Sequence, residues 1–153
     1  MRRKDREQSE EFGWDVLETC PYAILSTTDD EGASLQHPRV SGGARGRHLR
    51  SFRQARHKVE ASARAPRSVP GSVRDVVPLP EAYSTEYASA VVRGTIAEVT
   101  DDAERIAALH AIVERYAAEN LAHFDTALAE ELSHTLVWKI TPTELTAKAR
   151  LHE

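Results

Sequence analysis

The densest group of side chains able to bind a ligand is a basic segment, residues 34–74. It holds ten bases and one acid, a formal charge of +9, whereas the other residues sum to −13 and the whole chain to −4. Cations at this density neutralise phosphates, either of nucleic acid or of a phosphorylated cofactor. The ten bases are Arg39, Arg45, Arg47, Arg50, Arg53, Arg56, Lys58, Arg64, Arg67 and Arg74.

The composition of the basic segment leaves its role open. Phe52 is the only aromatic residue among the ten charges, so a platform on which nucleic-acid bases stack has little support. Apolar residues are sparse from Ser34 to Ser72 and follow neither a strand nor a helix period, which predicts a loop or a disordered stretch. A nucleic-acid-binding module and a solvated segment without a ligand both remain alternatives.

Other residue types that carry chemistry lack the spacing that chemistry needs. The seven histidines form no short metal-ligand pattern, so we expect no metal site. Cys20 is the only cysteine and lies on the apolar face of a predicted helix, where core packing is its expected role. Ser26 and Ser89 have no His/Asp arrangement beside them. The sequence therefore assigns no catalytic residue.

Length and composition place the chain among globular proteins. A chain of 153 residues and 17.0 kDa has the usual size of one domain, so we expect a single domain over 1–153. No run approaches the roughly 20 apolar residues of a membrane span, and no apolar stretch follows the basic N-terminus as in a signal peptide. We expect a cytoplasmic protein that does not bind membranes.

Hydrophobic periodicity predicts helices and strands on either side of the basic segment. We expect a helix over 9–20 capped by Ser9, and a strand over 22–28 that ends at the turn 29–32. Farther on come a loop at Pro78 and Pro80, a strand over 87–99 with Gly94 as a bulge or close approach, and helices over 100–116 and 120–132. A strand over 134–141 and a short β-like tail from Pro142 follow. This order is typical of an α+β domain on an antiparallel barrel or sheet.

Several stretches resemble one known family. They are MRRKDRE at 1–7, PYAILST at 21–27, DEGA at 30–33, DVVP at 75–78, STEYASAVV at 84–92 with Gly94, ERY at 114–116 and ELTAK at 144–148. They resemble the nitroimidazole-resistance proteins of the pyridoxamine 5′-phosphate oxidase-like, FMN-binding split-barrel group. The resemblance implies an α+β fold with an antiparallel six-stranded split β-barrel and flanking helices, a homodimer, and FMN at the dimer interface.

The central third departs from the family pattern. The family carries a phosphate-binding His-Ser-Ala-x-x-Gly-x-Lys stretch here, and only Lys58 stands where that motif has its lysine. The resemblance therefore implies that Lys58 neutralises the FMN phosphate, with Arg56 and His57 beside it as further cofactor-binding residues.

A shifted reading frame would explain the departure. Residues 34–49 can be encoded by codons that, read in the neighbouring frame, translate as PYSIPVSPVVREGDIF. The continuation through Arg56 translates in that frame as AHSARQG. That translation is an apolar, strand-like sequence that ends in the missing phosphate-binding motif. Residues 62–72 allow a similar shift of frame. We hypothesise that residues 34–56 and 62–72 are encoded in a shifted reading frame.

The function that the resemblance implies is an FMN-binding flavoprotein, a nitroreductase-like flavin-dependent reductase with a nicotinamide electron donor and a small-molecule substrate. The alternatives are a nucleic-acid-binding module and a degraded family member without a cofactor. For the homodimer, we expect the strand over 87–99, with Val137 and Trp138, to supply an apolar surface.

Overall fold

The computed structural model of the chain describes residues 3–28, 34–39, 48–53 and 69–151. Within these residues, seven antiparallel strands form one sheet in the order β1-β7-β6-β5-β2-β3, and β4 also pairs with β7. The protein is therefore α+β, as predicted. The strands are β1 (Glu7–Gln8), β2 (Ala23–Thr28), β3 (Ser34–Arg39), β4 (His48–Arg53), β5 (Val69–Leu79), β6 (Ser84–Glu98) and β7 (Thr135–Arg150).

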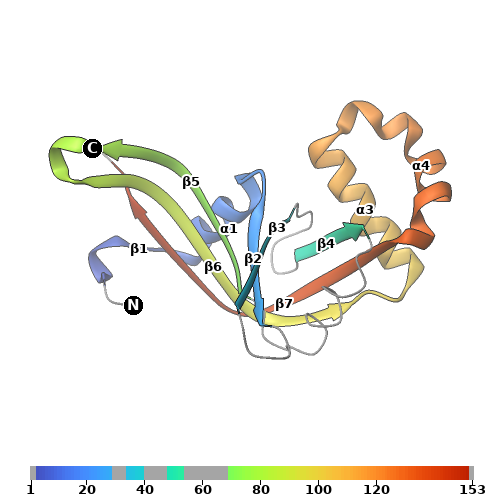
Figure 1. Ribbon diagram of the computed structural model, residues 1–153, viewed down its shortest axis with the longest axis horizontal. Helices are drawn as coiled ribbons and strands as arrows, with labels where there is room; N and C mark the ends of the chain where they lie inside the picture. The colour runs from blue at the N-terminus through green and yellow to red at the C-terminus, as the bar shows by residue number, and fades with distance from the viewer. Residues whose placement is uncertain (1–2, 29–33, 40–47, 54–68, 152–153) are drawn as a thin grey trace.

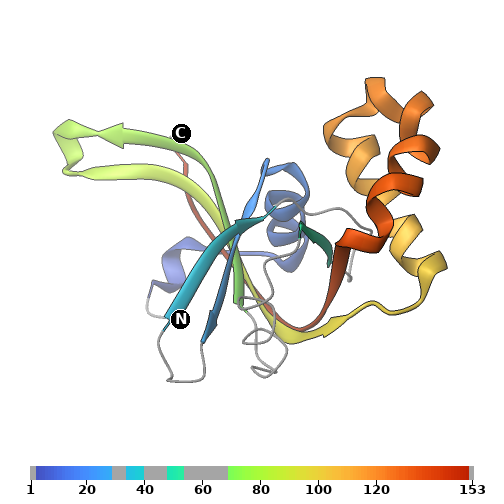
Figure 2. The same ribbon diagram turned by 45° about the vertical axis from the view of Figure 1, so that its right-hand side comes forward.

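Helices lie in two places around the sheet. Figure 1 shows α1 against the middle of the sheet, α3 and α4 together at one end, and the long β5–β6 hairpin reaching out at the other. Figure 2 shows the same arrangement after a 45° turn. In the part of the chain that the structure describes, no helix is long and apolar enough to cross a membrane. The α-helices are α1 (Glu10–Thr19), α3 (Asp102–Tyr116) and α4 (Phe124–Glu131). Short 3₁₀-helices are η1 (Lys4–Arg6), η2 (Pro80–Ala82), η3 (Ala118–His123) and η4 (Leu132–His134).

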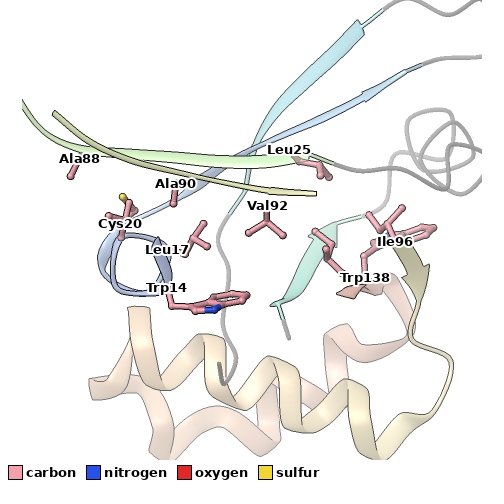
Figure 3. Packing of buried hydrophobic residues seen from close by; sticks show 11 residues of the cluster. Trp14, Leu17, Cys20, Leu25, Ala88, Ala90, Val92, Ile96 and Trp138 are labelled. Carbon is pink, nitrogen blue, oxygen red and sulfur yellow. The ribbon is translucent and has the colours of Figure 1, made fainter. Parts of the chain in front are cut away.

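Helix α1 begins where the sequence predicts and packs on the sheet through one face. The Ser9 hydroxyl accepts a hydrogen bond from the backbone N–H of Phe12 at 3.1 Å, which is the N-cap geometry. The buried side chains of α1, Trp14 and Leu17 among them, face small residues of β6 (Figure 3). Because alanines line that part of β6, the helix approaches the sheet closely and buries its apolar face.

The prediction of a loop over residues 34–72 is wrong in three places. Residues 34–39 return as β3 and pair with β2 in a regular register from Ala23↔Arg39 to Thr28↔Ser34. Residues 48–53 form β4, which pairs with the first part of β7, and β5 begins at Val69. Neighbouring strands supply the backbone hydrogen bonds here, and such tertiary pairing overrides a weak apolar pattern.

Pro78, expected in a loop, and Pro142, expected to begin a separate β-like tail, both lie inside long strands. Pro78 pairs with Thr85 of β6 and lies beyond residues 69–71, which pair with β2. In the described part of the chain, β6 is therefore the only strand beside Pro78, and its missing N–H falls on the open edge. Pro142 lies opposite Gly94, where the register of β6 and β7 shifts. Because an irregular register tolerates proline, the β-like tail expected from Pro142 continues the preceding strand, and β7 runs on to Arg150.

The helical segment between β6 and β7 also differs in detail. Asp101, and not Thr100, caps α3, because its carboxylate accepts the Glu104 N–H at 2.8 Å. The helix expected over 120–132 is divided into η3 and α4.

The apolar surface expected from Val137 and Trp138 is absent, because both side chains are buried inside the protomer. Val137 is 0% exposed and Trp138 is 2% exposed, and β4 pairs with this stretch of β7 through Ser51↔Val137 and Arg50↔Trp138. These residues therefore contribute to the core and not to an interface.

Candidate functional site

The candidate site lies on the face of the β6–β7 ladder that is turned away from α1. Alternate residues of a strand point to opposite faces of a sheet. Ala88, Ala90 and Val92 are buried, so the side chains between them point outward. Val91, at 37% exposed, is an apolar residue left uncovered on this face.

Three cross-strand pairs build a hollow on this face. Its volume is about 380 Å³, and we call it the outer groove. The register of β6 and β7 places the six lining residues opposite one another as Ser89↔Lys148, Val91↔Thr146 and Arg93↔Glu144.

The outer groove combines an apolar centre with hydroxyls and an excess of positive charge. The Ser89 hydroxyl donates to the backbone carbonyl of Lys148 at 3.3 Å. The Arg93 Nε lies 3.7 Å from a carboxylate oxygen of Glu144, with both side chains more than half exposed. An exposed pair at this distance is weak in water, so an anionic ligand can compete for Arg93. With Lys148, the lining carries two cations and one carboxylate.

Backbone contacts fix the end of the outer groove. The register of β6 and β7 shifts between Arg93 and Gly94. A Cβ at Gly94 would lie 2.4 Å from the Thr141 carbonyl oxygen, closer than such atoms can approach. The Thr143 hydroxyl donates to the Arg93 carbonyl at 3.2 Å. The prediction that Gly94 marks a bulge or close approach is confirmed, and the bulge sets where Arg93 and Glu144 meet.

The cofactor-binding residues predicted from the sequence, Arg56, His57 and Lys58, lie outside the described residues. Among the ten bases of the basic segment, Arg74 is the one whose side chain is described. It donates to an Asp15 carboxylate oxygen at 2.7 Å and has its Nε 3.2 Å from Asp75. Arg74 therefore joins β5 to α1 and is engaged within the fold.

Cys20 is a core residue, as predicted. Its side chain is 1% exposed and belongs to the main apolar cluster. Burial raises the pKa of the Cys20 thiol, so the reactive thiolate is disfavoured. Across the described ranges, no three His, Cys, Asp or Glu side chains gather as metal ligands.

Sequence reasoning missed the outer groove because its six residues come from two strands about fifty positions apart. The available signal was alternation, since apolar residues alternate with polar ones in ELTAK at 144–148 and, apart from Val91, in ASAVVR at 88–93. Without the register, this pattern does not show that Ser89 faces Lys148.

The fold and the groove define a class: an α+β protein in which α1 covers one face of an antiparallel sheet and the outer groove lies on the other. The chain belongs to the pyridoxamine 5′-phosphate oxidase family, whose profile matches residues 9–149. No curated protein matches the chain significantly.

Solved structures share the fold at low sequence identity. A candidate 5-nitroimidazole antibiotic resistance protein of Bacteroides thetaiotaomicron is 18% identical, with a TM-score of 0.78 over 93% of this chain and 84% of that one. The FAD and heme binding protein of Mycobacterium smegmatis is 22% identical, with a TM-score of 0.80 over 96% and 74%. The FAD binding protein of the same organism is 18% identical, with a TM-score of 0.69 over 96% and 99%.

Proposed function

We propose that the protein is a flavoprotein that binds FMN and acts as a nitroreductase-like, flavin-dependent reductase. Family membership and the flavin-binding structural relatives support a flavin as the ligand. A nicotinamide donor and a small-molecule acceptor complete the proposed reaction. The observation that carries the proposal is the outer groove.

The residues of the outer groove fit a flavin. The isoalloxazine ring needs an apolar surface, and its polar edge needs hydrogen-bonding groups and complementary charge. Val91 offers the apolar contact, Ser89 and Thr146 offer hydroxyls, and Arg93 and Lys148 offer positive charge.

In this proposal the protein binds, orients and shields the cofactor. When bound, the flavin supplies the chemistry, because it carries electrons from the donor to the acceptor. The side chains of β6 and β7 hold the ring against the sheet, and Lys58, with Arg56 and His57, binds the phosphate. No side chain is assigned as a proton donor.

We also propose that the six longer strands, β2 to β7, form a split β-barrel and that the protein is a cytoplasmic homodimer. Apolar exposure on the outer face supports the dimer, since Val73 is 58% exposed and lies beside the groove, opposite Ser89. A second copy covering this face would bury Val73 and Val91 and keep water from the flavin.

Purification of the full chain tests the flavin proposal directly. The protein is expected to bind FMN with a flavin absorption band, and the released cofactor identifies FMN or FAD by chromatography. Failure of both flavins to bind at micromolar concentrations would overturn the proposal. Salt-dependent binding of nucleic acid without flavin binding would favour the alternative module.

A further inference from the structure

A second hollow lies next to the outer groove, where the N-terminal segment crosses the end of β7. Strand β1 pairs with β7 through Glu7↔Lys148 and Gln8↔Ala147, which brings η1 to the last residues of β7. The hollow has a volume of about 520 Å³, and its polar lining includes Arg3, Asp5, Arg6, Gln8 and Arg150. We call it the arginine hollow.

The charges of the arginine hollow do not cancel. Three guanidinium groups face one carboxylate, which leaves an excess of two positive charges. This excess is local, because the whole chain carries −4. Attraction of an anion to this place therefore follows from the cluster and not from the net charge of the protein.

Asp5 holds Arg3 in position. The Arg3 Nε donates to one carboxylate oxygen of Asp5 at 2.8 Å, and a terminal nitrogen donates to the other oxygen at 2.5 Å. This hydrogen bonding lowers the pKa of Asp5 to about 2, so the carboxylate stays ionised at neutral pH. The pairing is two-pronged and orients the Arg3 guanidinium.

Arg6 and Arg150 supply the charge that Asp5 does not match. Arg150 donates to the hydroxyl of Ser84, a neutral partner. Among the described residues, Arg6 forms no ion pair within 4 Å. Both guanidiniums line the hollow, and they come from different elements, Arg6 from η1 and Arg150 from β7.

We propose that the arginine hollow is a binding site for a phosphate monoester. A guanidinium presents a planar fork of donors that matches phosphate oxygens. A phosphate dianion balances the two excess charges, whereas a carboxylate balances only one. The arginine hollow shares no lining residue with the outer groove, so the proposal does not depend on flavin binding there.

A nearby aromatic residue favours a nucleotide as the source of the phosphate. Tyr87 lies opposite Arg150 in the β6–β7 register, so the two side chains lie on the same face of the sheet. An aromatic ring beside a phosphate site offers a stacking surface for a base.

Calorimetric titration of the full chain tests the site. The probes are inorganic phosphate, adenosine 2′-phosphate and, as the uncharged control, adenosine. The variants are Arg6→Ala and Arg150→Gln, with Lys4→Ala as the matched control, because Lys4 lies in η1 but does not line the hollow. Each arginine variant is expected to bind both phosphates about three- to tenfold more weakly, as expected for one exposed charge-assisted contact. Lys4→Ala should change binding less than about twofold.

The outcomes separate the possibilities. Tighter binding of adenosine 2′-phosphate than of inorganic phosphate supports a nucleotide ligand, and equal binding supports free phosphate at the same site. Equal affinities in the wild type and both arginine variants, or an equal loss in Lys4→Ala, overturn the proposal. Thermal unfolding of each variant checks its fold, and Arg6→Lys, which keeps the charge but loses the fork, should bind with intermediate affinity.

Discussion

Gly94 lies against the backbone of Thr141, and no side chain fits between them. A Cβ on Gly94 would be 2.4 Å from the Thr141 carbonyl oxygen and 3.0 Å from its carbonyl carbon. Both atoms belong to the backbone of the paired strand, so they cannot move aside as a flexible side chain would. This close approach at the bulge keeps β6 and β7 together beside the outer groove.

Gly94→Ala should therefore destabilise the protein. Forcing a methyl group into this contact shifts the β6–β7 ladder at a cost of about 1–3 kcal/mol. The free energy of unfolding from chemical denaturation measures the effect. Gly71→Ala is the matched control, because a Cβ there meets nothing closer than 3.8 Å. An equal effect of the two substitutions would contradict the role of the contact.

The pH dependence of Asp5 gives a second prediction. Hydrogen bonding to Arg3 lowers its pKa to about 2 from an ordinary value of 3.8. A lowered pKa in the folded state means that the stabilisation is present above the unfolded pKa and is lost as the pH falls from about 4 through 2. A carbon-detected NMR titration should place the Asp5 midpoint near 2 in the wild type.

The control for this titration is Arg3→Ala. Removing the guanidinium should return the Asp5 midpoint toward 3.8, because the two donated hydrogen bonds are lost. The stabilisation is small, since both side chains are exposed. An unchanged midpoint in the variant would show that Arg3 does not set the pKa.

The phosphate role of Lys58 gives a third prediction. An ammonium held against a phosphate contributes about 1.5–3 kcal/mol when partly desolvated, so Lys58→Ala should weaken FMN binding by about ten- to a hundredfold. Riboflavin, which lacks the phosphate, should bind both proteins nearly equally. Equal FMN affinities, or an equal loss for riboflavin, would remove Lys58 from the phosphate site.

Local patterns were sufficient where one segment carries its own signal. Ser9 predicts the start of α1 because its side chain caps the helix within four residues. The period-two pattern of β6 predicts a strand, and Gly94 marks its irregular point. These features depend on neighbours in sequence, which a single chain displays.

Features that depend on distant partners could not be read in this way. β3 and β4 carry arginines and few apolar residues, and they form strands because β2 and β7 supply their hydrogen bonds. Pro142 suggests a strand end, yet the bulge opposite Gly94 accommodates it. The outer groove needs the register that places Ser89 against Lys148, and no local pattern contains that register.

The reading-frame hypothesis gives a fourth prediction. β3 and β4 lie within the text hypothesised to be out of frame, although their backbones pair as strands. A gene in which the reading frame is restored over residues 34–56 and 62–72 should encode apolar side chains in β3 and β4. Because burying apolar area contributes roughly 25 cal/mol per Å², the restored protein should unfold at a higher denaturant concentration. If single-base shifts in the coding DNA do not yield strand-like sequence over both ranges, the hypothesis fails.

The outer groove gives the last prediction, through Val91 at its centre. Val91→Glu places a carboxylate on the apolar surface proposed for the flavin ring and adds negative charge beside Lys148, its diagonal neighbour across the ladder. Burying that charge under a ring or a second copy of the chain is unfavourable. The variant should bind FMN at least about tenfold more weakly, a loss of 1.4 kcal/mol or more, and light scattering should report less dimer.

Thr95→Glu is the matched control for Val91→Glu. Thr95 is exposed on the same strand, lies beyond the bulge and does not line the groove. It introduces the same charge, so it should leave flavin binding and assembly unchanged. If both variants lose FMN equally, the effect comes from net charge. If neither loses FMN, the flavin binds elsewhere, and the outer groove is not its site.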